Sequence, residues 1–401
     1  MKEVAARHPD NSLVACLYAE SLMNLQPWAH WNREGVAAEH TTAIVKVLED
    51  GLQKWPESPA LCHLYIHMME MSPTPEKALP AADRLFDAVG GSGHLIHMPS
   101  HIYMRIGDYD EVITANAAAI AVDEEYVQDA GPYNFYSLYR IHNYHFLVYG
   151  AMFDGQSEVA LRTAREINKQ VPADMLKEQV DYLDAFMPTA LHVMIRFGKW
   201  DEILEEPQPA EYLPTSRAIR LYARGIAYAA TGRVVEAQKE QTAFRLAVKQ
   251  VPETSYLFQN TSLDILGVAD AMLDGEIAYR EGDYERAFRR LEDAVRLDDG
   301  LKYDEPWGWM QPARHALGAL LLEQGELVRA EGVFRQDLKL HPHNMWALHG
   351  LAESLRRLDK TEEAEAVALE FKVASARADI QVDRSCFCRL ETTCGECCRK
   401  K

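Results

Sequence analysis

The chain has 401 residues, more than one compact core usually holds, so several domains or one elongated array are expected. Its formal charge of -19 argues against nucleic acid and anionic membrane surfaces as partners, because both repel an acidic protein at long range. No apolar run approaches the ~18 to 20 residues that span a bilayer, and residues 1–10 are unlike a signal sequence, so we expect a soluble, cytoplasmic protein.

The first residues read as part of a helical pair. Residues 1–10 resemble the end of a second helix, closed by His8-Pro9-Asp10, with no first helix before it. Repeat arrays cover their terminal apolar face with a polar cap, so we expect 1–10 to be the remnant of a preceding helix, with upstream sequence missing. An irregular insertion follows at 26–35. Long loops of this kind are often functional, and the alternative is a decoration that packs aromatic side chains on a rim.

A helical repeat occupies the body of the chain. Apolar positions follow helical spacing, and a glycine turn is followed five residues later by alanine in four places: Gly155 and Ala160, Gly232 and Ala237, Gly282 and Ala287, and Gly325 and Ala330. A tetratricopeptide (TPR) unit has about 34 residues in two antiparallel helices, with a small residue at their crossing. We therefore predict an all-α, TPR-like, right-handed superhelical α-solenoid over 11–373, histidine-rich at 59–170 and regular at 216–373. A second long insertion covers 300–312.

Histidines form a ladder within the histidine-rich part. His63 and His67 are four residues apart, as are His97 and His101, and the second pair follows the first by 34 residues, one repeat period. Residues at i and i+4 share a helix face, and neighbouring helices pack ~8 to 10 Å apart. We therefore expect the four imidazoles to form a square on one surface of the array.

Flanking helices add candidate ligands to this surface. An insertion that lengthens the first repeat places Glu20 opposite His67, and Glu70 and His94 each lie three residues from a ladder histidine. Imidazoles with one or two carboxylates suit Zn, Cu, Fe or Ni rather than Ca or Mg. The alternative is that the histidines are packing residues and bind no cofactor. The metal-ligand candidates are Glu20, His63, His67, His97, His101, His142 and His145.

Cysteines crowd into the end of the chain. Five of the seven lie in the last sixteen residues: Cys386, Cys388, Cys394, Cys397 and Cys398. No packing signal follows the last repeat, so we predict that 374–401 is a disordered, cysteine-rich tail. The alternative is that its thiolates hold zinc or copper. The body is left without a disulfide framework, which favours a reducing compartment.

Several segments carry a family resemblance. The histidine motifs His63-Leu-Tyr-Ile-His67, Gly93-His-Leu-Ile-His-Met-Pro-Ser-His101 and His142-Asn-Tyr-His-Phe146, together with Pro27-Trp28, are similar to a family of tetratricopeptide-repeat proteins found widely in bacteria. The resemblance covers about residues 9–360. It implies the helical-repeat fold, a longer amino terminus and a shared histidine-rich segment, but no established activity, and the cysteine tail departs from it.

Two functions fit these patterns. The primary prediction is a scaffold that binds a protein or peptide partner in its concave groove, and its warrant is fold analogy alone. The second is a metal-binding protein, or a metal-dependent redox or hydrolytic enzyme, in which the ladder holds one or two ions and Glu20 or Glu70 accepts a proton. No phosphate loop, nucleophile elbow or nucleotide fingerprint is present, so covalent and phosphoryl-transfer catalysis have no support, and enzymatic activity stays open.

Overall fold

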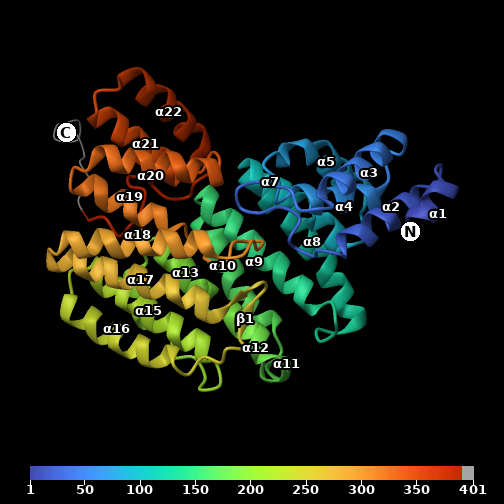
Figure 1. Cartoon of the computed structure of the whole chain (residues 1–401). Coiled ribbons are helices and arrows are strands. Elements are labelled where there is room, and N and C mark those ends of the chain that lie inside the picture. The colour runs from blue at the N-terminus through green and yellow to red at the C-terminus, as the bar shows by residue number, and fades with distance from the viewer. Residues whose placement is uncertain (391–401) are drawn as a thin grey trace. The chain divides into compact units, whose positions relative to one another are not determined.

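The computed structural model describes residues 1–390 and is built almost entirely from helices (Figure 1). In this part of the chain the only strand pair is a short antiparallel hairpin of β1 (Tyr256–Leu257) and β2 (Asn260–Thr261). The chain divides into two units, residues 1–150 and 151–401, and each is described by itself. The all-α prediction is confirmed, and neighbouring helices pair within each unit.

Unit 1 consists of successive helices that pack on their neighbours in sequence. Residues 26–40 lack regular helix, and the Trp31 indole N–H within them donates to the Met68 carbonyl at 2.8 Å, which holds the insertion against the next repeat. The elements are α1 (Lys2–Arg7), α2 (Ser12–Met23), α3 (Thr41–Lys54), α4 (Pro59–Met69), η1 (Pro75–Ala78), α5 (Leu79–Ala88), α6 (Gly93–His97), α7 (Pro99–Ile106), α8 (Tyr109–Ala130) and α9 (Ser137–Asp154), which continues into unit 2.

Unit 2 contains the regular helical pairs. Its elements are α10 (Ser157–Gln170), α11 (Ala173–Glu178), α12 (Val180–Leu183), η2 (Asp184–Phe186), α13 (Thr189–Arg196), α14 (Trp200–Glu205), α15 (Pro214–Ala230), α16 (Val234–Val248), β1, β2, α17 (Ser262–Glu281), α18 (Tyr284–Gly300), α19 (Ala313–Glu323), α20 (Leu327–Leu340), α21 (Met345–Arg357) and α22 (Thr361–Ala374). The helices of this unit pack extensively as the pairs α15–α16, α17–α18, α19–α20 and α21–α22.

The pair α17–α18 shows why the sequence pattern produces this packing. Gly282 ends α17 with φ 82°, a left-handed conformation that glycine adopts without steric cost. Five residues later, Ala287 is fully buried in α18. A Cβ atom on Gly275 would lie 2.7 Å from Leu291, so only glycine permits this approach of the two helices. Small residues therefore fix how closely the pair packs.

The insertion at 300–312 lies between α18 and α19, and its aromatic side chains are not placed alike. Trp309 is almost fully buried, with 1% of its surface exposed, so it belongs to the core of unit 2 rather than to a rim. Trp307 donates its indole N–H to His341 at 2.9 Å. Asp298, at the end of α18, accepts the backbone N–H of Ala313 at 3.0 Å and so caps α19.

The segment after α22 differs from the predicted disordered tail. Residues 375–390, which we call the C-terminal segment, pack against the helices of unit 2. Its Asp379 carboxylate accepts the backbone N–H groups of Ser157 and Glu158, both at 2.8 Å, at the start of α10. The buried Arg389 forms two hydrogen bonds to Glu353, at 2.7 and 3.0 Å. These partners are polar and distant in sequence, which is why hydrophobic periodicity did not reveal them.

The remaining tail cysteines, Cys394, Cys397 and Cys398, lie outside the described residues. Within the described part, Cys386 and Cys388 are joined as a disulfide.

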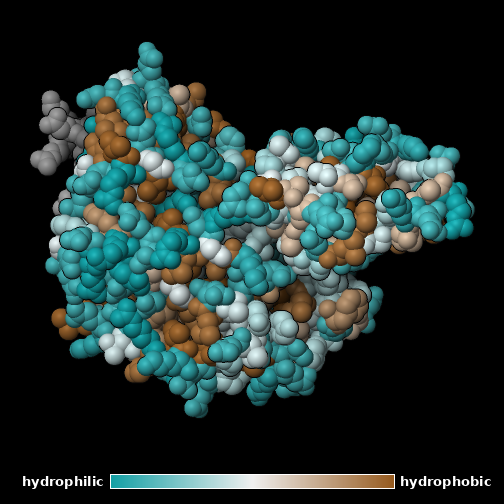
Figure 2. Space-filling model, viewed as in Figure 1, coloured by the Kyte–Doolittle hydropathy of each residue, from teal (hydrophilic) through white to brown (hydrophobic). Residues whose placement is uncertain are grey.

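The surface seen in Figure 2 is mainly hydrophilic, and its apolar areas are interrupted by polar side chains. Across residues 1–390 no helix combines the length and the apolar character that crossing a bilayer requires.

Replacing Arg389 with Met tests whether the C-terminal segment stabilises unit 2. The substitution removes the 2.7 Å ion pair with the buried Glu353 carboxylate and leaves its 3.3 Å pair with Arg357 in place. Removing one member of a buried pair typically costs several kcal/mol, and we expect the free energy of unfolding to fall by about 3 kcal/mol. Urea denaturation followed by tryptophan fluorescence measures this change. Lys372→Met, which removes an exposed cation from α22, is the control, and equal stability of the two variants would contradict the assignment.

Candidate metal centre

Four helices and one helix end of unit 1 bring titratable side chains together. Helix α4 carries two histidines one turn apart and ends at the buried Glu70. Short helices α6 and α7 carry three more, and α9 supplies one across from them. Among the described residues, three groups of possible ligand atoms lie within 4.8 Å of one another: His63, His67 and His94; His97, His101 and His142; and His67, Glu70 and His101.

Local sequence sets the position of α6 and α7. Pro99 has no backbone N–H, so α6 ends at His97 and α7 begins at the proline. The rings of His97 and His101 nevertheless face each other, with their centroids 4.7 Å apart. Gly93 is the first residue of α6, and it lies close to Asp123 of α8. A Cβ atom added to Gly93 would lie 1.9 Å from a carboxylate oxygen of Asp123. Glycine at this position is therefore required for α8 to approach the histidines.

The first triad consists of His63, His67 and His94, and all three side chains are partly exposed. The Nε2 atoms of His63 and His94 lie 3.2 Å apart. The rings of His63 and His67 are in edge contact at 4.8 Å, as expected for residues one turn apart. This triad is the part of the cluster closest to solvent.

The second triad consists of His97, His101 and His142, and it is more deeply buried. The Nε2 atoms of His97 and His101 lie 2.7 Å apart. Phe146, one turn after His142 on α9, contacts both of these rings at centroid distances of 5.1 Å and excludes water from one side. The pair of nitrogens therefore faces one another in an apolar enclosure.

The outer nitrogens of His97 and His101 in the second triad are each held by a polar side chain. The Nδ1 atom of His97 lies 2.6 Å from Oδ1 of Asn116, and the amide nitrogen of Asn116 donates to the Val112 carbonyl at 2.8 Å. That second bond turns the amide oxygen toward the imidazole, so Nδ1 of His97 carries the proton. The Nδ1 atom of His101 lies 2.7 Å from Oε2 of Glu70.

Glu70 also contacts the first triad. Its other oxygen, Oε1, lies 3.3 Å from Nδ1 of His67. The Arg105 side chain donates to the backbone carbonyl of Glu70 at 2.8 Å, which fixes this helix end. One buried carboxylate thus orients a histidine from each triad.

Burial keeps the imidazoles neutral. It lowers the pKa of His63 and of His97 to about 3 and the pKa of His67 and of His94 to about 4, and the neighbouring histidines lower most of these values further. The pKa values of the two remaining triad members, His101 and His142, are also lowered by burial. Burial raises the pKa of Glu70, against the smaller opposite effect of Arg105. A neutral imidazole is the form that binds a metal ion.

The arrangement of protons in the second triad has two self-consistent forms. In the first, Glu70 is protonated and donates to Nδ1 of His101, which then donates its Nε2–H to Nε2 of His97. In the second, Glu70 is ionised and accepts the Nδ1–H of His101, so both Nε2 lone pairs face each other at 2.7 Å. Two lone pairs at that distance repel, and a cation bound by both relieves the repulsion.

The structure brings together most of the predicted ligands, in a different grouping. Instead of a square of four, the ladder histidines divide between two triads that also include His94 and His142. Glu20 is exposed, and neither it nor the buried His145 belongs to any of the three ligand groups found within residues 1–390. Asn116, on α8, was not predicted, because a single amide on an otherwise ordinary helix carries no sequence signal.

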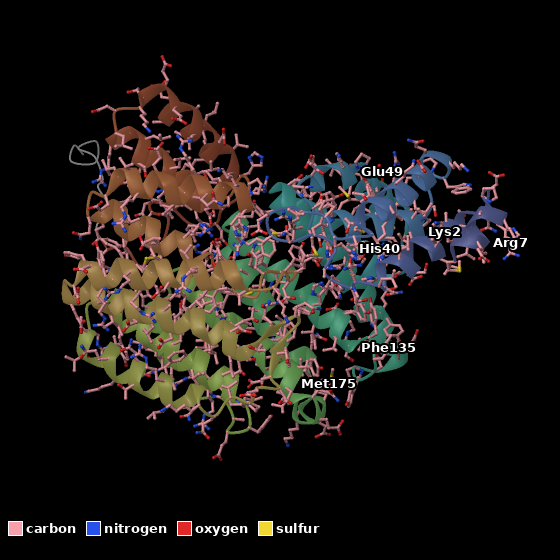
Figure 3. The ribbon with its side chains drawn as sticks, viewed as in Figure 1. Lys2, Arg7, His40, Glu49, Phe135 and Met175 are labelled. Carbon is pink, nitrogen blue, oxygen red and sulfur yellow. A yellow bond between two sulfur atoms is a disulfide. The ribbon has the colours of Figure 1, made fainter. Side chains whose placement is uncertain are left out.

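Aromatic side chains surround the first triad. Trp28, from the 26–35 insertion, contacts the ring of His67 at 5.7 Å, and Tyr139 contacts the ring of His94 at 5.1 Å. Phe135, in the connection between α8 and α9, is 85% exposed and projects from the ribbon in Figure 3. The 26–35 insertion therefore contributes a side chain beside the cluster.

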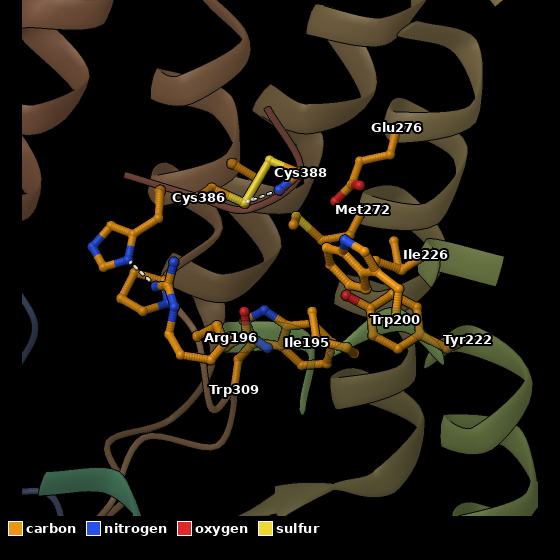
Figure 4. Close-up of a pocket in the computed structure, with 14 residues that line it drawn as sticks. Ile195, Arg196, Trp200, Tyr222, Ile226, Met272, Glu276, Trp309, Cys386 and Cys388 are labelled. Carbon is orange, nitrogen blue, oxygen red and sulfur yellow. Dashed lines mark hydrogen bonds between the residues drawn. A yellow bond between two sulfur atoms is a disulfide. The ribbon is translucent and has the colours of Figure 1, made fainter. Parts of the chain in front are cut away.

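Unit 2 contains a separate small pocket, about 10 Å³ in volume, which is lined in part by Cys386 and Cys388 (Figure 4). The buried Arg196 donates to Nδ1 of His315 at 2.7 Å, and Nε2 of His315 lies 2.8 Å from the Asp337 carboxylate. This chain of contacts fixes the His315 tautomer, with its proton on Nε2. Through His315, the Asp337 carboxylate neutralises the buried Arg196 cation within unit 2.

Glu276 also lines this pocket and is 4% exposed. Burial raises its pKa to about 7, against a smaller opposing effect of Arg280. The carboxyl group therefore changes its charge near neutral pH inside unit 2.

Comparison with known proteins adds the fold alone. No family model matches the chain, and no curated protein matches it. Among solved structures, it is similar to the Naa15/Naa10 complex bound to HypK-THB (11% identity, 94% of this chain and 60% of that chain, TM-score 0.36). It is also similar to a Rap protein complexed with competence and sporulation factor (12% identity, 92% of this chain and 99% of that chain, TM-score 0.39). A third similar structure is the TPR domain of P58(IPK) (11% identity, 92% of this chain and 97% of that chain, TM-score 0.25).

The chain spans about 60% of the length of the first of these structures. At such identities and TM-scores the likeness carries no argument about partners or activity. The assignment of function therefore depends on the chemistry of the site.

Replacing Glu276 with Gln is expected to change how the stability of unit 2 depends on pH. A carboxyl group with a raised folded-state pKa stabilises the protein below its unfolded pKa, and this contribution is lost as the pH rises through about 7. When the pH is raised from 4.5 to 8.5, the unfolding free energy of wild type should therefore fall by about 3 kcal/mol more than that of the variant. Denaturant titrations at several pH values measure this, with exposed Glu285→Gln as control. Parallel pH profiles for Glu276→Gln and wild type would refute the prediction.

Proposed function

We propose that unit 1 binds a transition metal ion through the imidazole nitrogens of its second triad. One observation carries this proposal: the Nε2 atoms of His97 and His101 lie 2.7 Å apart while both Nδ1 atoms are engaged by outer partners. Histidine ligands of metals almost always donate their other ring N–H to a carboxylate or carbonyl oxygen. Glu70 and Asn116 provide these two acceptors.

The donor set limits the class of ion. Three neutral nitrogens without a carboxylate in the triad suit Zn, Cu, Fe or Ni, and not Ca or Mg. Metal–nitrogen bonds of ~2.0 to 2.1 Å place two ligands of one ion roughly 3 to 3.5 Å apart, so a small rotation of the His97 and His101 rings accommodates it. Three protein ligands leave a position open for water or another small molecule, as catalytic metal sites require.

Protein binding is a second proposal, and one surface favours it. Tyr126, Tyr133 and Phe135 are 41%, 46% and 85% exposed around the end of α8 and the connection to α9. Exposed aromatic residues are typical of binding surfaces. The scaffold function predicted from the sequence, with a protein or peptide in a concave groove, stays a prediction supported by the helical-repeat class alone.

The His97→Asn/His101→Asn variant tests the metal proposal. The full chain should carry bound metal by mass spectrometry, and the double variant should lose the ion of the second triad, because two of the three ligands of that triad are absent. Both proteins carry Ser in place of the five C-terminal cysteines, so that thiolates do not contribute. The exposed His8→Asn variant is the control. Equal metal content in the double variant and the control, with both folded by circular dichroism, would rule out this site.

Asn116 is a positioning residue in this proposal, and its substitution has a separate signature. Asn116→Ala removes the acceptor that orients His97, so the affinity for the bound metal should fall 10- to 100-fold. Asn116→Asp restores an oxygen acceptor of the same size and should recover most of that affinity. Competition titrations against a chelator measure both variants. If Asn116→Asp binds as weakly as Asn116→Ala, Asn116 serves packing alone.

A further inference from the structure

The first triad lies directly beside the second. The rings of His94 and His97 are stacked at a centroid distance of 6.3 Å, and those of His67 and His101 are in edge contact at 5.7 Å. Each triad contributes one ligand atom from each of three imidazoles, and no histidine belongs to both. The six histidines therefore form two adjoining sets of three rather than one large set.

Glu70 connects the two sets. Its Oε1 atom contacts Nδ1 of His67 and its Oε2 atom contacts Nδ1 of His101, at 3.3 and 2.7 Å. Because the two nitrogens of an imidazole lie on opposite sides of the ring, both Nε2 atoms point away from the carboxylate. The same carboxylate thus aims one imidazole at each triad.

Resting on the metal-binding function proposed above, we infer that this cluster is a two-ion centre, with one ion in each histidine triad, and that both ions are Cu(I). All three histidines of the first triad are partly exposed, whereas His97 and His101 of the second are buried, so the first triad is the outer position and the second the inner one. A two-ion centre uses the ligand atoms of all six imidazoles, whereas one ion in one triad uses three of them.

Charge selects Cu(I) among the ions that imidazole accepts. Two ions in adjoining triads repel in proportion to the product of their charges, so two dications repel four times as strongly as two monocations at the same separation. Both triads consist of neutral ligands, Glu70 is the only carboxylate in the ligand groups of residues 1–390, and Arg105 adds a positive charge at its backbone. Of Zn, Cu, Fe and Ni, only copper has a stable monovalent ion, and Cu(I) accepts three ligands in a trigonal arrangement.

Anaerobic titration with Cu(I) against a chromophoric chelator tests this inference on the full chain with the five C-terminal cysteines replaced by Ser. The wild-type triads should bind two ions per chain. His63→Asn/His94→Asn should lose the outer ion and keep one, and His97→Asn/His142→Asn should lose the inner ion and keep one. Glu70→Gln, which preserves all six ligands, should weaken both ions at least tenfold. Thermal unfolding by circular dichroism identifies any variant that fails to fold.

The outcomes separate the inference from the function on which it rests. One ion per chain, lost in both double variants, would leave the metal site in place and overturn the two-ion centre. Two ions that equimolar Zn²⁺ displaces would overturn the assignment of Cu(I). If both double variants fail to fold, Glu70→Gln is the remaining test. An unchanged affinity of this variant for both Cu(I) ions would overturn the shared role of the carboxylate. No bound ion would overturn the function and the inference together.

Discussion

The buried carboxylate of Glu70 is the constraint on which the histidine cluster depends. It lies at the end of α4 and contacts the Nδ1 atoms of His67 and His101, so it sets the orientation of one ring in each triad. A carboxylate taken out of water must be compensated by hydrogen bonds or by positive charge. In this protein a proton on the carboxyl group is the compensation in one form, and the metal ion of the proposed function would provide it in the other. The same burial that makes Glu70 costly as an anion also keeps the imidazoles neutral and ready to coordinate.

The helical repeat provides the positions, and irregular features refine them. Equivalent helices place histidines side by side because residues one turn apart share a face. The close approach at Gly93 then brings α6 against α8, and the helical spacing of His97 and His101 across Pro99 keeps their rings in contact. In unit 2 the same kind of repeat stays regular. There, glycines and alanines at helix crossings produce close packing, and the buried polar groups neutralise one another.

Much of the fold, and part of the site, followed from sequence. Helical spacing and the glycine-to-alanine pattern predicted paired helices because both depend on local geometry. The histidine ladder predicted that α4 and the region of α6 and α7 would share a surface. Its equal square was wrong, because His94 joins the first ladder pair and His142 joins the second, which divides the cluster into two triads. The position of Glu20 depends on how the irregular insertion shifts the register, and the C-terminal segment depends on ion pairs between residues far apart in sequence, such as Arg389 with Glu353. Neither kind of contact has a periodic signal.

The most direct test is X-ray absorption spectroscopy at the copper edge of the Cu(I)-loaded full chain, with its five C-terminal cysteines replaced by Ser. A two-ion centre predicts that each copper has imidazole nitrogens and no sulfur in its first shell, at roughly 2.0 Å, and a second copper at roughly 3.5 to 4 Å. A first shell of sulfur would assign the copper to cysteine thiolates instead. A first shell of light atoms without imidazole scattering would show that the copper binds elsewhere. Either result would contradict the claim that Glu70 and Asn116 orient these histidines toward metal ions.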